Sequence, residues 1–398
     1  DGITYPLIGY LSDLTYARRG TRKDWVIAGT LMSVLGVWKL MRPPESVDAV
    51  YFGIWMTVTY VGWKLMEIPL QAWSYGLSED YAQRMRVQAW RGAAQMGGQL
   101  LFFLIPFLAV QVGVSDSTEL DFRSLGFSAV ICAIALPVAT LLAVAFVPNG
   151  VAPPPATPHR PGLAEVWQAI RRNPPLLRLL AAFLPVNLLG GLASGVMYLY
   201  VDIYLGLSKQ FPAIMVLALF GSIVGIPFWS WLATRYERHR VWAVSLIIGG
   251  IACSGLVLAT PGPTALPLVL LIYPTLMFTL IGAVVFYAMS ADIVDYGRLV
   301  TGEDHAGLYG SIFQFLQKSL QGVSAAAGLA LVGFFGFDAT ASAQSAGGTF
   351  GIKFVGAVLP ALGLLGAAAL IWNFSLTRAR VAEIQAQLHR REEAKPPG

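Results

Sequence analysis

The chain has 398 residues and a formal net charge of +5; 56% of its residues are hydrophobic and only 12% are charged. Because soluble globular domains carry about a quarter charged residues, this composition excludes a soluble globular protein. The basic residues are dispersed over short connecting segments and never form one patch with interleaved aromatic side chains, which argues against nucleic-acid binding. We therefore predict an integral membrane protein embedded in a lipid bilayer.

The apolar runs are long enough for transmembrane α-helices, which need about 20 residues each, and they lack the alternation of barrel strands. The chain opens inside the end of one such run, at residues 1–12, so we expect at least one helix to precede it. Further runs follow at residues 25–42, 48–76, 88–112, 124–147, 176–205, 211–233, 241–260, 264–291, 306–337 and 352–376. With one preceding helix, the intact protein would cross the membrane twelve times.

Basic residues alternate between successive connecting segments. Thirteen lie in one set of segments, at residues 13–24, 84–86, 160–172, 235–240 and 298, whereas the intervening set holds three, Arg42, Arg123 and Lys209. The positive-inside rule places the richer set in the cytoplasm. We therefore predict a multi-pass membrane protein with a cytoplasmic C-terminus. The membrane that we expect is the bacterial inner (plasma) membrane.

A proline-rich segment and a weak internal repeat divide the chain into two halves. Residues 148–175 hold APPPATPHRP and then an amphipathic pattern, which we interpret as a cytoplasmic linker with a surface helix; a passive tether is the alternative. The segment PLIGYLSDLTYARRGTRKDW recurs in degraded form as IPFWSWLATRYERHRVW, six helices later. We predict an N-terminal half at 1–147, the linker, a C-terminal half at 176–376 and a tail at 377–398, with a cavity between the halves.

Four predicted helices carry polar side chains on one face at membrane depth, where such groups must meet water, substrate or one another. The faces are Asp1, Thr4 and Tyr5; Tyr60, Trp63, Lys64, Glu67 and Gln71; Arg91, Gln95 and Gln99; and Gln314, Gln317, Lys318 and Gln321. A charge at the bilayer centre costs about 3 kcal/mol, so we expect these faces to line one shared cavity. Alternatively, the charges only hold helices together, as Lys64 with Glu67 and Arg91 with Asp1.

No pattern typical of catalysis or metal binding is present in the sequence. Cys132 and Cys253 lie singly in apolar runs, and the four histidines lack the spacing of metal ligands. The motifs HExxH, Walker A and GxSxG are missing as well. We therefore predict a protein that is not an enzyme and has no metal site or cofactor; the alternative from another class is a non-transporting membrane sensor or a membrane enzyme.

Three groups of residues together resemble the glycoside-pentoside-hexuronide:cation symporters, the melibiose-carrier group of the major facilitator superfamily. They are DGITYPLIGYLSD with RRGTRKDW, the EIP of residues 67–69 followed by Arg91, and SADIVDYG followed by Lys318. The resemblance implies an all-α polytopic fold of two six-helix halves. It also implies a secondary transporter that moves a sugar, glycoside or hexuronide by alternating access. Lysolipid-like amphiphiles are the alternative substrate, and we expect a monomer whose partners are this small molecule and the bilayer.

The resemblance and the polar faces together assign roles to individual residues. We expect substrate binding by Trp63, Glu67, Arg91, Gln95 and Lys318, cation or proton coupling by Asp1, Thr4, Tyr5, Lys64 and Gln314, and gating by Asp13, Arg22, Asp292 and Asp295.

Two positions depart from the family's pattern at the cation site. Tyr5 stands where the family has a second cation-binding aspartate, and Lys64 replaces a small hydroxyl residue. Sodium needs several hard oxygen ligands, whereas this site has lost a carboxylate and gained an ammonium group. We expect the Lys64 ammonium to take the cation's place, which leaves proton coupling or cation-independent transport and disfavours sodium.

Overall fold

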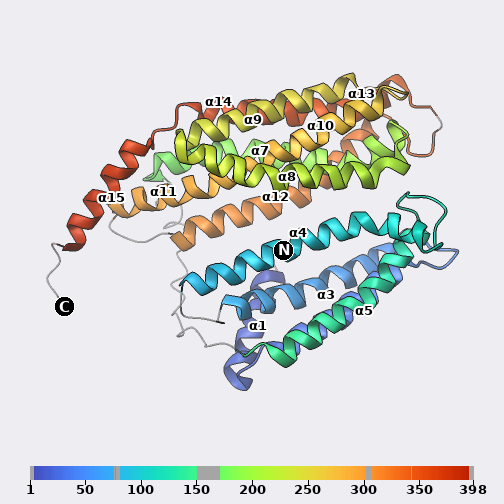
Figure 1. The fold of residues 1–398 in the computed structure, drawn as a ribbon, viewed down its shortest axis with the longest axis horizontal. Coiled ribbons are helices and arrows are strands. Elements are labelled where there is room, and N and C mark those ends of the chain that lie inside the picture. Colours follow the sequence, from blue (N-terminus) through green and yellow to red (C-terminus); the bar gives the residue numbers. More distant parts are fainter. Residues whose placement is uncertain are drawn as a thin grey trace. The chain divides into compact units, whose positions relative to one another are not determined.

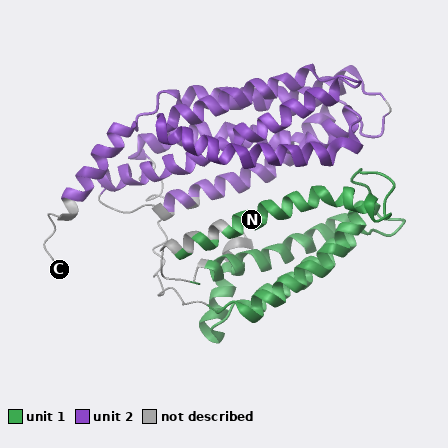
Figure 2. Ribbon diagram, in the orientation of Figure 1, with its two compact units in different colours: residues 1–158 green, residues 159–398 purple. Residues whose placement is uncertain are grey.

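The computed structural model describes residues 4–75, 77, 81–149, 171–301, 306–341 and 343–393, and all secondary structure among them is helical (Figure 1). The chain divides into two compact units, residues 1–158 and residues 159–398 (Figure 2). The division falls within the predicted linker at 148–175. The surface helix predicted there lies mostly at residues 150–170, outside the described residues, and stays a prediction.

Unit 1 contains five described helices that follow the predicted apolar runs. They are α1 (Thr4–Arg19), α2 (Lys23–Met41), α3 (Ala49–Tyr75), α4 (Tyr81–Gln111) and α5 (Phe122–Phe146). α2 packs along α3 and α5. Small residues allow α2 and α3 to approach closely: a side chain added at Gly29 would collide with the backbone of Met66, and one at Gly62 with the backbone of Ser33. This contact holds the polar helix α3 in place.

Unit 2 contains longer helical segments, several of which change helix type along their length. The composite segments are these: α7 (Pro174–Tyr198) continues into the π-helical η1 (Leu199–Tyr204); η2 (Ser208–Gln210) continues into α8 (Phe211–Arg235); α9 (Arg238–Gly255) continues into η3 (Leu256–Leu258); α10 (Ala265–Leu280) continues through η4 (Ile281–Ala283) into α11 (Val284–Thr301); and α13 (Ala346–Lys353) continues through the π-helical η5 (Phe354–Val358) into α14 (Leu359–Trp372). The other described elements are α12 (Ala306–Phe334) and α15 (Arg378–Glu393). α7 packs against α12 and α14, and α9 packs against α14 and α10.

Asn173 fixes the start of α7 within unit 2. Its side-chain oxygen accepts a hydrogen bond from the backbone N–H of Leu176, which caps the helix. Its amide nitrogen donates to the carbonyl oxygen of Ile293 on α11 and to the hydroxyl of Tyr309 on α12. One buried side chain therefore begins α7 and ties it to two helices that are distant in the sequence.

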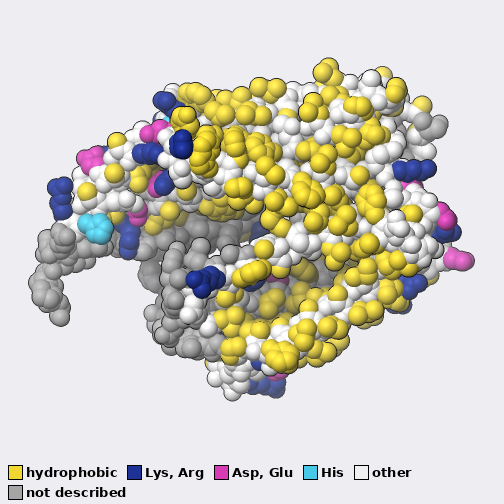
Figure 3. Space-filling model, in the orientation of Figure 1, with side chains coloured by type: hydrophobic (Ala, Val, Ile, Leu, Met, Phe, Trp, Pro, Cys, Tyr) yellow, Lys and Arg dark blue, Asp and Glu magenta, His cyan; other side chains and the backbone are white. Residues whose placement is uncertain are grey.

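Eight helical segments among the described residues are long and apolar enough to cross a membrane. Many of their large hydrophobic side chains face outward, including Leu271 and Tyr287, and on the visible face of unit 2 hydrophobic side chains cover the middle of the helices (Figure 3). Lipid is the environment in which such a surface is stable. Two long helices, α3 and α12, fall outside this set because they carry the predicted polar faces.

The largest differences from the predicted runs occur at helix ends. The run predicted at 264–291 continues through η4 into α11 and ends at Thr301, and α4 begins at Tyr81 rather than residue 88. Polar residues at these ends are compatible with a helix that extends beyond the hydrocarbon layer, although they carry no apolar signal. The tail forms the helix α15, which packs against α11 and buries Ile384, only 1% exposed.

Candidate functional site

An ion pair inside α3 is the most buried charged group of unit 1. Lys64 and Glu67 lie one turn apart, and Lys64 Nζ donates to Glu67 Oε2 at 2.8 Å. Lys64 is 6% exposed, and the Glu67 side chain is 28% exposed. The Lys64 ammonium also lies over the Tyr60 ring, 5.4 Å from its centroid. The pairing expected from the spacing is therefore present, and it satisfies two charges on an apolar helix.

Arg91 connects α4 to the same helix. Its Nη1 donates to the Ser74 hydroxyl at 3.0 Å, and Ser74 is a buried residue near the end of α3. Gln95, one turn further along α4, is exposed, as is Trp63 on α3. Glu67 and Trp63 thus both lie on α3, and Arg91 contacts the same helix at Ser74, seven residues beyond Glu67. Sequence reasoning missed Ser74, because a serine in an apolar run gives no signal of its own.

The predicted coupling residues of the first helix are outside what the structure describes. Asp1 precedes the described residues, and for Thr4 and Tyr5 only the helical backbone of α1 is described. Their roles stay predictions.

In unit 2, the predicted polar face belongs to α12. Gln314 and Lys318 lie one turn apart on this helix; Gln314 is exposed and Lys318 is half-buried. α12 packs closely against α7 through small residues: a side chain added at Gly195 would collide with the backbone of Ala325, and one at Gly328 with the backbone of Leu192. Lys318 and the charges of α3 lie in different units, so their sharing of one cavity stays a prediction.

The four predicted gating residues all have polar partners within their own units. In unit 1, Arg22 donates to Asp13 at 2.7 Å, and its guanidinium lies 4.1 Å from the centroid of the Tyr16 ring. In unit 2, Arg238 Nη1 contacts both carboxylate oxygens of buried Asp292, at 2.5 and 2.6 Å.

Asp295, one turn after Asp292, accepts a hydrogen bond from Gln385 Nε2 of α15 at 3.2 Å. Sequence reasoning found both aspartates but missed their partners. Arg238 is signalled only as one member of the basic segment at 235–240, and no sequence signal points to Gln385.

A chain of apolar helices in two compact units, with paired charges inside a helix, defines a polytopic membrane protein. The sequence profile of the family described as MFS/sugar transport protein matches residues 1–378. Because this match spans nearly the whole chain, the protein belongs to that family and has the major facilitator fold. It is a transporter rather than an enzyme.

Known relatives are similar along most of their length. The inner membrane symporter YicJ of Escherichia coli is 25% identical, with 98% of this chain and 84% of the relative covered. A glucuronide carrier protein homolog of Escherichia coli is 25% identical, covering 96% of this chain and 83% of the relative. The sodium-dependent lysophosphatidylcholine symporter 1-A of Danio rerio is 21% identical, covering 92% of this chain and 75% of the relative.

Solved structures with the same fold include a peptide transporter, POT, with a TM-score of 0.60 and 16% identity over 92% of this chain and 85% of that one. The fucose:proton symporter of Escherichia coli has a TM-score of 0.51 and 16% identity, and the shares covered are 93% and 88%. At these identities the likeness concerns the fold alone.

Proposed function

We propose that the protein is a secondary transporter that moves a sugar, glycoside or hexuronide across the membrane by alternating access. The observation that carries this proposal is the buried Lys64–Glu67 pair on a helix of a sugar-transport family member. Ionised side chains on a transmembrane helix are costly, so they are retained where they are used. One relative is named as a glucuronide carrier homolog and another as an inner membrane symporter; the first name supports this class of substrate and the second supports symport.

The proposed substrate contacts divide by chemistry. Glu67 accepts hydrogen bonds from sugar hydroxyl groups, while Arg91 and Lys318 donate to ring oxygens or to a hexuronide carboxylate. The exposed face of Trp63 stacks on the sugar ring, and Gln95 supplies an amide one turn from Arg91. Two cations among the proposed substrate contacts, against one carboxylate that already has a lysine partner, favour an acidic sugar over a neutral one.

The proposed coupling ion is the proton rather than sodium. The Lys64 ammonium lies 2.8 Å from Glu67, so sodium would have to displace a cation that belongs to the protein itself. Protonation of Glu67 would instead neutralise the acid, weaken the pair and free Lys64, which makes the pair itself a proton-responsive element. Asp1, Thr4, Tyr5 and Gln314 are the remaining proposed coupling residues, and Asp13, Arg22, Asp292 and Asp295 the proposed gate.

Uptake into proteoliposomes tests substrate and ion together. A panel of labelled glycosides, hexuronides and lysolipids is offered while the sodium gradient and the pH gradient are varied independently. We expect uptake of a hexuronide or glycoside that rises with an inward proton gradient and is unchanged by sodium. Clear stimulation by a sodium gradient at constant pH would falsify proton coupling, and uptake of none of the sugars would contradict the substrate class.

Lysolipid-like amphiphiles are the second candidate substrate. The similarity to the lysophosphatidylcholine symporter extends over 92% of this chain, which favours this alternative. Uptake of lysolipids but not of sugars in the same panel would show that lysolipids are the substrate.

We also propose a monomer in the bacterial inner membrane with a cytoplasmic C-terminus. Reporter fusions after α15 test the orientation, and the mass of the purified protein in detergent tests the oligomeric state.

A further inference from the structure

Unit 2 contains a partly open apolar cavity of ≈ 220 Å³, and no residue of α12 lines it. Its lining comes from α7, α9, α10 and α14, and it includes Met197, Cys253 and Met277. The two π-helical segments also contribute, η1 through Tyr200 and η5 through Gly356. π-Helical turns are rare and occur frequently at functional sites. Both of those found among the described residues border this one cavity.

Most polar groups on the cavity wall already have partners. The Tyr200 hydroxyl donates to the carbonyl oxygen of Leu256 at 2.5 Å, and the Ser194 hydroxyl donates to that of Gly191 at 2.8 Å. The Cys253 thiol lies 3.4 Å from the carbonyl oxygen of Ala357. The hydrogen atoms of these groups are therefore committed to backbone carbonyl oxygens.

Tyr273 of α10 is the exception on this wall. It is 5% exposed and lines the cavity, yet its hydroxyl has no hydrogen-bond partner among the residues that the structure describes. A hydroxyl that lines a cavity without a protein partner is available to a ligand, and a hydrogen bond to it is worth about 1 kcal/mol. An apolar cavity with one uncommitted hydroxyl fits a ligand that has an apolar body and one hydrogen-bonding group.

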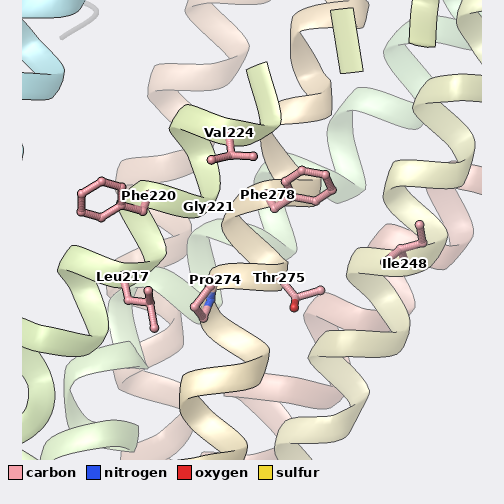
Figure 4. Close-up of a pocket in the computed structure, with 8 residues that line it drawn as sticks. All are labelled: Leu217, Phe220, Gly221, Val224, Ile248, Pro274, Thr275 and Phe278. Atoms are coloured by element: carbon pink, nitrogen blue, oxygen red, sulfur yellow. The ribbon is translucent and has the colours of Figure 1, made fainter. Parts of the chain in front are cut away.

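A second apolar hollow in unit 2 shows what an ordinary lipid-facing surface looks like here. It lies over α8, α9 and α10 (Figure 4), and its side chains, such as Phe220 and Val224, are largely exposed. Its hydroxyl group belongs to Thr275, which already donates to the carbonyl oxygen of Leu271 at 2.7 Å. The described residues that line this groove therefore offer no uncommitted side-chain hydroxyl, in contrast to the cavity beside Tyr273.

We propose that the cavity is a binding site for a small aromatic alcohol or phenol whose hydroxyl group pairs with Tyr273. In another protein, an apolar cavity of about 150 Å³ binds benzene, so the larger space here accepts about one to two fused rings. The tyrosine rings and the thioethers of Met197 and Met277 make favourable contacts with an aromatic body. The site lies entirely within unit 2 and does not depend on which substrate is transported.

Naphthol and methylnaphthalene form the matched pair of probes, because they share a ring system and a size but differ in the hydroxyl group. We measure the ligand-induced rise in unfolding temperature of the purified full chain at fixed detergent concentration. For the natural sequence we expect saturable stabilisation by both probes, with naphthol binding about fivefold to tenfold tighter. Equal affinity for the two probes, or no saturable effect, overturns the proposal.

Three variants locate the site. Tyr273→Phe keeps the ring and should abolish the preference for naphthol while leaving methylnaphthalene binding unchanged. Gly190→Leu should abolish binding of both probes, because Gly190 lines the cavity and a Cβ there meets nothing within 4 Å. Gly366→Leu is the matched control, since its Cβ is equally unobstructed but Gly366 is not a lining residue.

Persistence of the naphthol preference in Tyr273→Phe overturns the proposal. So does unchanged binding in Gly190→Leu. If that variant fails to fold, the Tyr273→Phe measurement still decides, because a phenylalanine is tolerated where the hydroxyl makes no bond within the protein.

Discussion

Two ion pairs with a buried partner, one in each unit, differ in how the chain brings their partners together. In unit 1, Lys64 and Glu67 are three residues apart on α3. In unit 2, Arg238 at the start of α9 meets Asp292 of α11, 54 positions further along the chain. A pair within one helix persists when helices move against one another, whereas a pair between helices breaks when they separate. The first arrangement suits ligand and proton chemistry, and the second suits control of helix position.

The largest loss of uptake is expected from a substitution in the intrahelical Lys64–Glu67 pair. Glu67→Gln removes both the proposed substrate acceptor and the proposed protonation site, so we predict a loss of uptake of about 100-fold or more, measured in proteoliposomes. Glu45→Gln, at an exposed position of the same unit, is the control and should leave uptake unchanged. Uptake by Glu67→Gln within a few-fold of the natural protein would remove Glu67 from the mechanism.

A related change tests the ion that the pair selects. Tyr5→Asp combined with Lys64→Ser restores the residue types that the family resemblance expects at the cation site. We predict that this double variant gains stimulation of uptake by a sodium gradient, whereas Tyr5→Asp alone does not, because Lys64 still neutralises the carboxylates. Sodium stimulation in the single variant would contradict the proposed role of Lys64.

Breaking the interhelical pair should act on stability. Arg238→Leu leaves Asp292 buried without its cation, and we predict a loss of about 2 to 3 kcal/mol, less than for a fully buried pair because Arg238 is partly exposed. The double variant Arg238→Leu with Asp292→Leu should recover most of this loss. Thermal unfolding in detergent measures both variants. A double variant as unstable as the single one would show that the pair itself stabilises the fold.

The next smaller effect is expected at α15, which packs against α11. Ile384→Ala removes a buried side chain of α15, and we predict that the packing of this helix loses about 2 kcal/mol, visible as faster hydrogen exchange across α15. Leu388→Ala, at a half-buried position, is the matched control with a smaller effect. Equal exchange in both variants would argue against Ile384 as the anchor.

The smallest effect on stability is expected in an exposed loop between α12 and α13. The Asp338 carboxylate accepts hydrogen bonds from the backbone N–H and the hydroxyl of Thr340, at 2.8 and 2.7 Å, and these bonds lower the pKa of Asp338 from its ordinary value. The stabilisation is therefore present above the ordinary pKa and is lost as the pH falls through the lowered one. Asp338→Asn should unfold at a slightly lower temperature at neutral pH and match the natural protein in strong acid.

Sequence reasoning succeeds for this protein where the relevant spacing lies within one helix. The apolar runs located the helices because each span must satisfy its own backbone in lipid and present apolar side chains to it. The same locality made the Lys64–Glu67 pair predictable. Helix ends were less predictable, as at Tyr81 and Thr301, because the apolar signal stops at the membrane surface while the helix does not.

Contacts between distant segments were decided by the tertiary structure. The pairing of Asp292 with Arg238 and the bond from Gln385 to Asp295 depend on helix packing that no local pattern encodes. The cavity beside Tyr273 needs four helices and two π-helical turns at once, so no single stretch of sequence reveals it. The sequence by itself determined a helical membrane transporter with charges inside its helices, because lipid constrains each helix separately. Only the tertiary structure decided which side chains of different helices meet, because that depends on how all the helices pack together.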